Sequence, residues 1–178
     1  MKPIVHSSEI VHENPWYRIR RDDLTWPNGK PGQYFVCEVP PGAAVICEQD
    51  GKLLTIKQYR HPIGQDSIEF PVGRTDDQDP ETAARRELHE ETGYEVESLI
   101  PIGKTDNLSG LASAVIHLFV GTNPRQAGSQ ELDDSESDMT VQWIPIPDWK
   151  RMIANGEITN AYALSAWAIY EQWKAEHL

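Results

Sequence analysis

Short apolar stretches separated by turn residues dominate the chain, and this pattern predicts mainly strands. Residues 16–20 alternate between apolar and polar side chains, and residues 34–37 resume the pattern after Pro27-Asn28-Gly29. The Asn-Gly pair is a strong turn signal because both residues tolerate positive φ. Further strands are expected at residues 43–47, 53–59, 67–70, 96–103, 114–120 and 139–145, the first two joined at Asp50-Gly51.

Three segments have the periodicity of helices. The first covers residues 80–92, with Asp79 as N-cap, Pro80 at the first helical position and Gly93 as C-terminal stop. The second covers residues 148–154. The third covers residues 161–176, and an apolar stripe on it is expected to pack into the core: Leu164, Trp167, Ala168 and Tyr170. Many strands with a few separated helices indicate a mixed sheet covered on both faces.

The composition indicates a folded, acidic protein. The 178 residues fit one domain or a domain with a small extension, and 39% are hydrophobic, enough for a packed core. Lys and Arg number 16 against 28 Asp and Glu, for a net charge of -12. This balance argues against a nucleic-acid-binding module, which needs clustered cations. It leaves room for a small polyphosphate substrate, because bound metal ions reverse the local charge of an acidic pocket.

The chain has no sequence signal for a membrane or for secretion. No apolar run approaches the ~18 residues that a membrane span requires, and residues 1–16 contain no sustained hydrophobic stretch of the signal-peptide type. Cys37 and Cys47 both lie in predicted strands and are expected to be reduced thiols. These features predict a cytoplasmic protein that contacts neither membrane nor nucleic acid.

The first predicted helix carries the most informative pattern. At about 100° per residue, Glu87, Glu90 and Glu91 fall within an arc of roughly 100°. Ala83 and Ala84 lie in or beside the same arc. A solvated acidic face would place the glutamates opposite the apolar residues. We therefore expect these carboxylates to point toward the protein or a cleft.

Three carboxylates at i, i+3 and i+4 repel one another. If they are partly buried, the cost rises unless they become protonated or bind a cation. Hard oxygen ligands suit Mg²⁺ or Mn²⁺, which also bind substrate phosphates. The alternative is a surface helix with Glu/Arg ion pairs along it.

Residues 86–94, Arg-Glu-Leu-His-Glu-Glu-Thr-Gly-Tyr, resemble the core of the Nudix box, G-x5-E-x7-R-E-U-x-E-E-x-G-U, where U is aliphatic or aromatic. The resemblance implies a loop-helix-loop that binds divalent cations, with Glu87, Glu90 and Glu91 as metal ligands. It implies an α/β (α+β) fold, the Nudix-type α/β/α sandwich with a mixed sheet and an N-terminal antiparallel β extension. It also implies hydrolysis of nucleoside diphosphates linked to another moiety.

The front half of the box departs from the family pattern. The segment from Gly73 to Gly93 is one residue too short, and the early Glu is absent. Its place falls between Gln78 and Asp79. Asp79 either replaces that carboxylate or acts as a simple helix cap.

The resemblance extends beyond the box, over most of the chain after about Trp16. Residues 57–60 and 68–73 are similar to the strand and approach of ADP-ribose and other ADP-sugar pyrophosphatases. This implies the Val72 carbonyl as a further metal ligand, and Arg60 and Glu69 as substrate-binding residues. Arg60 would contact the diphosphate or the terminal ribose, a role that suits a guanidinium fork. A surface salt bridge is the alternative role for Arg60.

The N-terminal part resembles the same group. Trp16 and Tyr34 align with aromatic positions that sandwich adenine, and core packing is the alternative for each. In that group the N-terminal strands cross to a second subunit, which implies a homodimer. The expected organisation is an N-terminal β extension over residues 1–40 and a Nudix catalytic domain over residues 41–178.

The stretch with least periodicity, residues 121–138, ends in an acidic cluster, and loops this long are usually functional or disordered. The resembled group has a catalytic Glu in this late loop. Ser137 lines up best, between Glu136 and Asp138, and Glu136 is the candidate base. A second departure is Ser109, which stands where the group has the proline of a Ser-Pro-Gly turn.

The resulting hypothesis is metal-dependent hydrolysis of the diphosphate bond of a nucleoside diphosphate sugar, with ADP-ribose giving AMP and ribose 5-phosphate as the leading case. Glu136, or one of the helix carboxylates Glu90 and Glu91, accepts the proton of the attacking water. A catalytically silent nucleotide-binding module is one alternative. The other is a Nudix hydrolase for a different substrate, such as GDP-mannose, another nucleotide sugar or a nucleoside triphosphate.

Overall fold

The computed structural model describes residues 1–177, and the chain divides into two compact units. The first unit contains Met1–Pro41 together with Asp106–Val115. The second contains Gly42–Thr105 and the chain from Ile116 onward.

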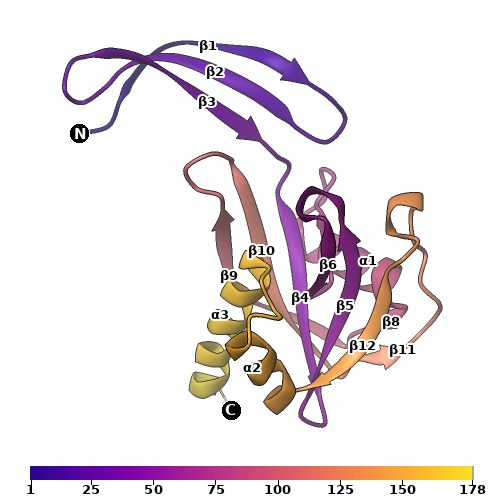
Figure 1. The fold of residues 1–178 in the computed structure, drawn as a ribbon. Coiled ribbons are helices and arrows are strands. Elements are labelled where there is room, and N and C mark those ends of the chain that lie inside the picture. Colours follow the sequence, from indigo (N-terminus) through magenta and orange to yellow (C-terminus); the bar gives the residue numbers. More distant parts are fainter. Residues whose placement is uncertain (178) are drawn as a thin grey trace. The chain divides into compact units, whose positions relative to one another are not determined.

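The first unit is built on a three-stranded antiparallel sheet, indigo to purple in Figure 1. Its strands are β1 (Ile4–Glu13), β2 (Arg18–Thr25) and β3 (Pro31–Glu38), with β2 in the middle. The predicted turn after β2 is present, with Gly29 at φ 80°. Strand β1 was not predicted, because polar residues interrupt its apolar ones and every residue of it is exposed.

The start of the second strand was predicted two residues too early. Trp16 and Tyr17 precede β2, where the Asn14 side chain accepts hydrogen bonds from both of their backbone N–H groups at 2.9 and 3.0 Å. In the other segment of this unit, Leu111 O accepts from Cys37 N at 2.9 Å. Gly110 O accepts from the Tyr34 hydroxyl at 2.6 Å. These bonds tie residues 106–115 to strand β3.

The second unit contains a mixed sheet in the order β12-β5-β4-β10-β9. Strand β4 (Gly42–Gln49) lies at its centre, parallel to β10 (Ala114–Thr122) and antiparallel to β5 (Lys52–Arg60). The remaining strands of this sheet are β12 (Thr140–Pro145), β9 (Ser98–Asn107), β6 (Gln65–Glu69), which pairs with β5, and β7 (Val72–Arg74), which pairs with β4.

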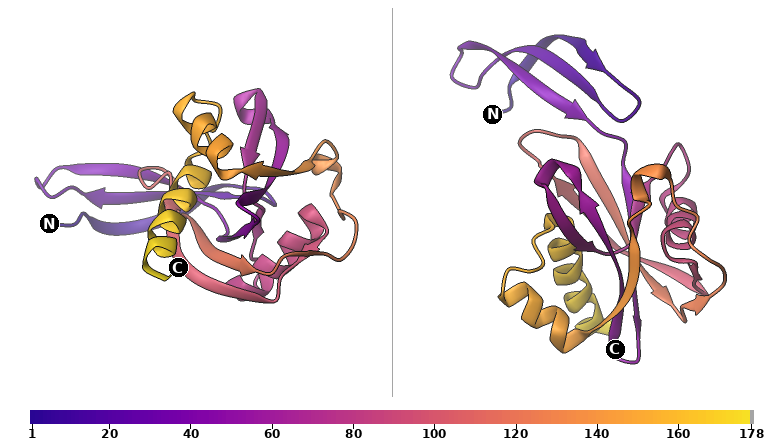
Figure 2. Two further views of the ribbon diagram at one scale, coloured as in Figure 1. Left: turned by 90° about the horizontal axis from the view of Figure 1, so that it is seen from below. Right: turned by 45° about the vertical axis from the view of Figure 1, so that its right-hand side comes forward.

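Helices cover both faces of this sheet, α1 on one side and α2 with α3 on the other (Figure 2, right). The helices are α1 (Pro80–Thr92), α2 (Ile146–Ala154) and α3 (Ala161–His177). Along β4, Val45 and Cys47 face the α1 side, whereas Ala44 and Ile46 face the α2 and α3 side. A strand buried on both faces has a continuous apolar sequence rather than an alternating one. The predicted α/β/α sandwich with a mixed sheet is confirmed.

The remaining elements are short. Strands β8 (Tyr94–Glu95) and β11 (Arg125–Gln126) form a two-stranded antiparallel pair. Two single-turn helices complete the structure. The first, η1 (His61–Ile63), follows β5, and the second, η2 (Asp134–Glu136), precedes β12. The long loop predicted over residues 121–138 therefore contains two short elements, β11 and η2. Among residues 1–177, no helix is both long and apolar enough to cross a bilayer.

The predicted apolar stripe of the last helix was wrong in part. Trp167 and Tyr170 are buried as predicted, but Ala168 is exposed and Leu164 only partly buried. The core-facing positions also include Tyr162, Ala163 and Ala166. The helix is apolar on several sides, so its periodicity alone did not select the buried side.

The two cysteines are free thiols, in accord with the expectation of reduced side chains. Cys47 is fully buried, and burial raises the pKa of its thiol to about 12. Cys37, on β3, is partly exposed.

Candidate active site

The helix that carries the box glutamates is capped as predicted. Asp79 Oδ1 accepts a hydrogen bond from Thr82 N at 3.0 Å, and Oδ2 accepts from the Thr82 hydroxyl at 2.5 Å. At the other end Gly93 has φ 73°, a conformation that favours glycine, and its N–H donates to His89 O at 2.7 Å. Both Asp79 oxygens serve the helix start, so the capping role explains this residue.

The predicted orientation of the glutamates is confirmed. Ala83 and Ala84 are completely buried against the sheet, and on the same side Glu91 is 2% exposed and Glu87 9%. Glu90 is half-buried at the edge of this face. The carboxylates thus lie on the core-facing side of α1 rather than on its solvated side.

Arg86 lies between two of these carboxylates. Its Nη1 atom is 2.8 Å from Glu87 Oε1 and 2.8 Å from Glu90 Oε2, and its Nη2 donates to Arg74 O at 2.8 Å. The Glu/Arg pairs that the alternative interpretation expected therefore exist. A single guanidinium thus serves two carboxylates, and Glu91 makes no ion pair with it.

Burial makes two of these carboxylates, Glu87 and Glu91, reluctant to ionise. Burial raises the pKa of Glu87 to about 7, even though Arg86 opposes the shift. Burial also raises the pKa of Glu91 well above its ordinary value, although Glu91 Oε2 accepts a hydrogen bond from Val72 N at 2.7 Å. A carboxyl pair of this kind is stabilised in its charged form by a nearby cation.

Gly73 lies directly against the Glu87 carboxyl group. A Cβ atom at position 73 would be 1.8 Å from Glu87 Cδ and about as close to both of its oxygens. No side chain fits there unless Glu87 moves. The backbone of strand β7 thus packs directly against the Glu87 carboxyl group. Val72, whose carbonyl is a predicted metal ligand, precedes Gly73 in this strand.

Arg60 and Glu69 form an ion pair with two hydrogen bonds. Arg60 Nε donates to Glu69 Oε1 at 2.8 Å, and Arg60 Nη2 donates to Oε2 at 2.6 Å. Glu69 is completely buried, whereas the Arg60 side chain is 38% exposed. The Tyr162 hydroxyl, from α3, donates a hydrogen bond to the carbonyl of Phe70, the residue that follows β6. The sequence contained no signal for the role of Tyr162 beyond its place in a helix.

Glu136, the candidate base of the late loop, belongs to η2. Its negative charge contributes to the raised pKa of both Glu87 and Glu91. The positive charge of Arg60 acts on Glu91 in the opposite direction. The structure therefore gathers three helix glutamates, Glu136 and Arg60 in one region of the second unit.

The donor set fits a hard divalent cation, although a ligand shell is not preassembled. Within residues 1–177, no three His, Cys, Asp or Glu side chains have their ligand atoms gathered as in a formed metal site. Arg86 instead supplies the positive charge between Glu87 and Glu90. Carboxylate and carbonyl oxygens are the ligands that Mg²⁺ and Mn²⁺ prefer. An ion held by these glutamates would take over the charge that Arg86 now balances.

The two aromatic candidates belong to the first unit. Trp16 is 67% exposed, so core packing does not explain it. The Tyr34 ring makes an edge contact with Trp26, with centroids 6.1 Å apart.

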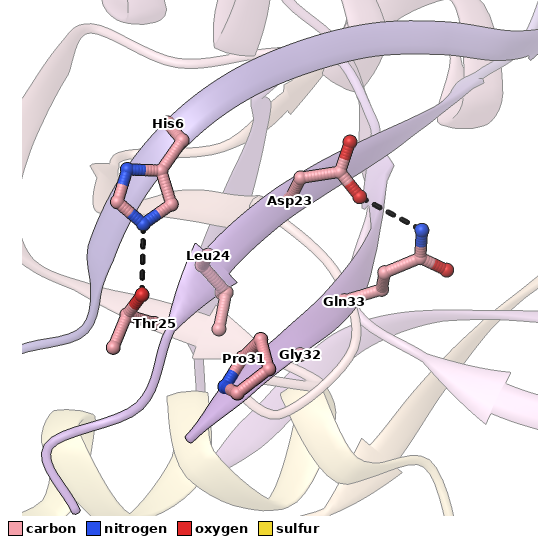
Figure 3. A pocket seen from close by; sticks show the side chains of 7 residues that line it. All are labelled: His6, Asp23, Leu24, Thr25, Pro31, Gly32 and Gln33. Carbon is pink, nitrogen blue, oxygen red and sulfur yellow. Dashed lines mark hydrogen bonds between the residues drawn. The ribbon is translucent and has the colours of Figure 1, made fainter. Parts of the chain in front are cut away.

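The first unit also contains a shallow hollow on its sheet (Figure 3). There His6 Nε2 bonds to the Thr25 hydroxyl at 2.8 Å, and Asp23 accepts from Gln33 Nε2 at 2.7 Å. The polar side chains of the hollow are thus paired with one another. This arrangement gives the hollow no evident catalytic group.

Two family models match the chain. The NUDIX domain model matches residues 40–165, and a model described as the nucleoside diphosphate sugar hydrolase N-terminal domain matches residues 4–37. A solved structure described as an ADP compounds hydrolase superposes with a TM-score of 0.86 at 20% identity, over 99% of this chain and 97% of that one. At this identity the superposition shows the shared fold.

Curated relatives extend the likeness along most of the chain. The ADP-ribose pyrophosphatase of Mycobacterium tuberculosis is 31% identical over 89% of this chain and 78% of its own length. The ADP-ribose pyrophosphatase of Bacillus subtilis is 28% identical over 87% and 86%. The GDP-mannose pyrophosphatase of Yersinia enterocolitica is 27% identical over 85% of each. The box motif, the sandwich fold and these matches together show that the chain belongs to the Nudix family and is a Nudix pyrophosphohydrolase.

Proposed function

We propose that this protein hydrolyses the diphosphate bond of a nucleoside diphosphate sugar, with ADP-ribose as the preferred substrate and Mg²⁺ or Mn²⁺ as cofactor. Water adds to a phosphorus atom, the bridging oxygen leaves, and the products are AMP and ribose 5-phosphate. The observation that carries the proposal is the convergence of the buried helix glutamates with Glu136 and Arg60. Two relatives named ADP-ribose pyrophosphatase support the choice of substrate.

Glu87, Glu90 and Glu91, with the Val72 carbonyl, would hold the metal. When bound, a divalent cation neutralises phosphate oxygens and lowers the pKa of a water molecule. Arg60, whose Nε and Nη2 atoms bond to Glu69, would offer its remaining N–H donors to the diphosphate or the terminal ribose. Glu69 binds substrate through Arg60, because both of its oxygens orient that guanidinium.

The proton of the attacking water needs an acceptor near the acidic face. Glu136 is the preferred base, since it lies close enough to affect the pKa of Glu87 and Glu91 and is itself only partly buried. Glu90 and Glu91 are the further catalytic carboxylates. A general base of this kind contributes about 10²- to 10⁴-fold to the rate.

We assign adenine recognition to Trp16 and Tyr34 in a homodimer, with residues 1–40 as the extension that crosses to the second subunit and residues 41–178 as the catalytic domain. Strand β1 supports this organisation, because all of its residues are exposed and several of them are apolar. A long exposed edge strand usually pairs with another chain or is protected from doing so. We place the enzyme in the cytoplasm, where its two free thiols remain reduced.

GDP-mannose is the second candidate substrate, since relatives named GDP-mannose pyrophosphatase match with similar coverage. The silent regulatory module has less support. The glutamates of the box core are all present and lie on the buried face of α1 or at its edge.

A panel of nucleotide sugars, incubated with Mg²⁺ or Mn²⁺ and resolved by chromatography, tests the proposal. We expect AMP and ribose 5-phosphate from ADP-ribose at the highest kcat/KM. Glu91→Gln should lose at least about 100-fold in kcat without loss of fold by circular dichroism. Preferred turnover of GDP-mannose would favour the second candidate. No turnover of any member, with binding retained, would favour the silent module.

A further inference from the structure

The segment that precedes the Glu136 loop is bonded to the carboxyl end of α1. Ala127 N and Gly128 N both donate to Gly93 O, at 2.9 and 3.0 Å. Glu131 N donates to Glu90 O at 2.8 Å. The last carbonyls of a helix have no partner within the helix, so this segment supplies their donors.

One side chain takes part in this attachment. Gln130 Nε2 donates to the Glu91 carbonyl at 2.7 Å, and Gln130 is half-buried. The peptide groups of Glu90 and Glu91 thus hold the loop, while the carboxylates of the same two residues belong to the acidic face. The chain then reaches Glu136 within six residues.

The attachment opposes an electrostatic force. Because Glu131 N bonds to Glu90 O, the acidic loop lies beside a helix end that carries Glu90 and Glu91, and like charges repel one another. The segment after Gln130 is itself acidic, with Glu131, Asp133, Asp134, Glu136 and Asp138. Without neutral anchors, repulsion would move this loop away from the helix. An uncharged amide donor resists that movement and adds no charge of its own.

We propose that Gln130 is a positioning residue that keeps the Glu136 loop at the acidic face of α1. The proposal rests on the proposed function, in which Glu136 is the base. Gln130 does not touch the reacting atoms; it acts through Glu136. If it merely completed the helix end, its removal would affect stability but would not be coupled to Glu136.

A double-mutant cycle tests this coupling. The variants are Gln130→Ala, Glu136→Gln and the double variant, with kcat and KM measured on ADP-ribose and Mg²⁺. Gln130→Ala is expected to lower kcat about tenfold, the order of one lost hydrogen bond, with KM within about twofold. Added to Glu136→Gln, it should lower kcat by less than about twofold more. Ser129→Ala, in the same loop, is the matched control and should retain the parent kcat.

A second measurement does not depend on turnover. Amide hydrogen exchange of residues 131–138 should be faster in Gln130→Ala than in Ser129→Ala, because the loop opens more often. Gln130→Glu, which keeps the size but loses the donor, should lower kcat at least as much as Gln130→Ala. This isosteric variant serves if the alanine variant does not fold.

Several outcomes would overturn the inference. Independent, multiplicative losses in the double variant would show that Gln130 does not act through Glu136. Unchanged exchange in the loop, or full activity of Glu136→Gln, would also contradict it while leaving diphosphate hydrolysis in place. Absence of hydrolysis by the parent chain would instead refute the proposed function, and the exchange measurement would still report on the loop.

Discussion

Arg60 on β5 and Glu69 on β6 meet through two parallel hydrogen bonds of 2.8 and 2.6 Å, with the carboxylate completely buried and the guanidinium partly exposed. The strands pair antiparallel, with Arg60 opposite Gln65 and Glu69 opposite Ile56, so the two long side chains meet diagonally across the pair. The pair fixes the direction of the one cation that we assign to substrate binding. The buried Glu69 carboxylate thus orients the partly exposed Arg60 guanidinium.

This pairing predicts different outcomes for two substitutions of Arg60. Arg60→Lys keeps the charge but loses the fork, and KM for ADP-ribose should rise about tenfold with kcat less affected. Arg60→Ala should in addition lower the free energy of unfolding by about 2–3 kcal/mol, because Glu69 is left buried without a counter-charge. Kinetics and urea unfolding measure the two effects.

Lys57→Ala is the control for that experiment. Lys57 and Asp66, on the same two strands, form an ion pair of 2.7 Å with both side chains largely exposed. Its loss should lower the free energy of unfolding by less than about 1 kcal/mol. Equal destabilisation by Lys57→Ala and Arg60→Ala would contradict the importance of burial at Glu69.

Gly73→Ala should disturb the acidic face without changing any charge. The added Cβ atom would be 1.8 Å from Glu87 Cδ, so the Glu87 carboxyl group must move. We expect affinity for Mn²⁺ and kcat to fall, each by at least about tenfold. Gly110→Ala, where a Cβ atom meets nothing within 4 Å, should leave Mn²⁺ affinity unchanged in calorimetric titration. A Gly73→Ala enzyme with parental Mn²⁺ affinity would argue against Glu87 as a ligand.

Divalent cations should stabilise the folded protein. Binding to the native state alone adds about 2.7 kcal/mol at a ligand concentration 100 times Kd. Thermal unfolding should therefore shift to higher temperature with Mg²⁺ or Mn²⁺, and EDTA should reverse the shift. In Glu91→Gln the shift should be much smaller. An equal shift in parent and variant would mean that the ion binds elsewhere.

A pH-dependent contribution is expected from Glu48, on the opposite face of the sheet. Burial raises the pKa of Glu48, but hydrogen bonds from Lys174 and the Tyr170 hydroxyl outweigh burial, and the net pKa is lowered from 4.5. A lowered folded-state pKa means that the native state releases this proton more readily than the unfolded state does. The contribution to stability is therefore present above about pH 4.5 and is lost as the pH falls through the folded-state pKa.

Lys174→Met tests this dependence. The variant should be less stable than the parent by about 1–2 kcal/mol at pH 7, and the difference should shrink below about pH 4.5. Lys150→Met, which removes a more exposed ion pair with Glu171, is the control and should show a smaller difference at pH 7. A Lys174→Met difference that is constant from pH 7 to pH 3 would contradict the assignment. Urea unfolding across this pH range provides the measurement.

The carboxylate helix could be predicted because its determinants are local. Asp79, Pro80 and Gly93 delimit α1, and the positions of the glutamates relative to Ala83 and Ala84 follow from helix geometry alone. Strand β1 could not be predicted, since its residues are exposed on every side and need no apolar alternation. The buried side of α3 was also ambiguous, because apolar residues surround much of that helix.

The sequence by itself determined that three glutamates share the core-facing side of one capped helix, because spacing along a helix is set by its backbone. Only the tertiary structure decided what surrounds them. Glu69 bonds to Arg60 diagonally across two paired strands, and the loop that leads to Glu136 bonds to the end of α1. Such contacts join distant positions of the chain. They depend on how the whole sheet and its loops pack, which no local pattern specifies.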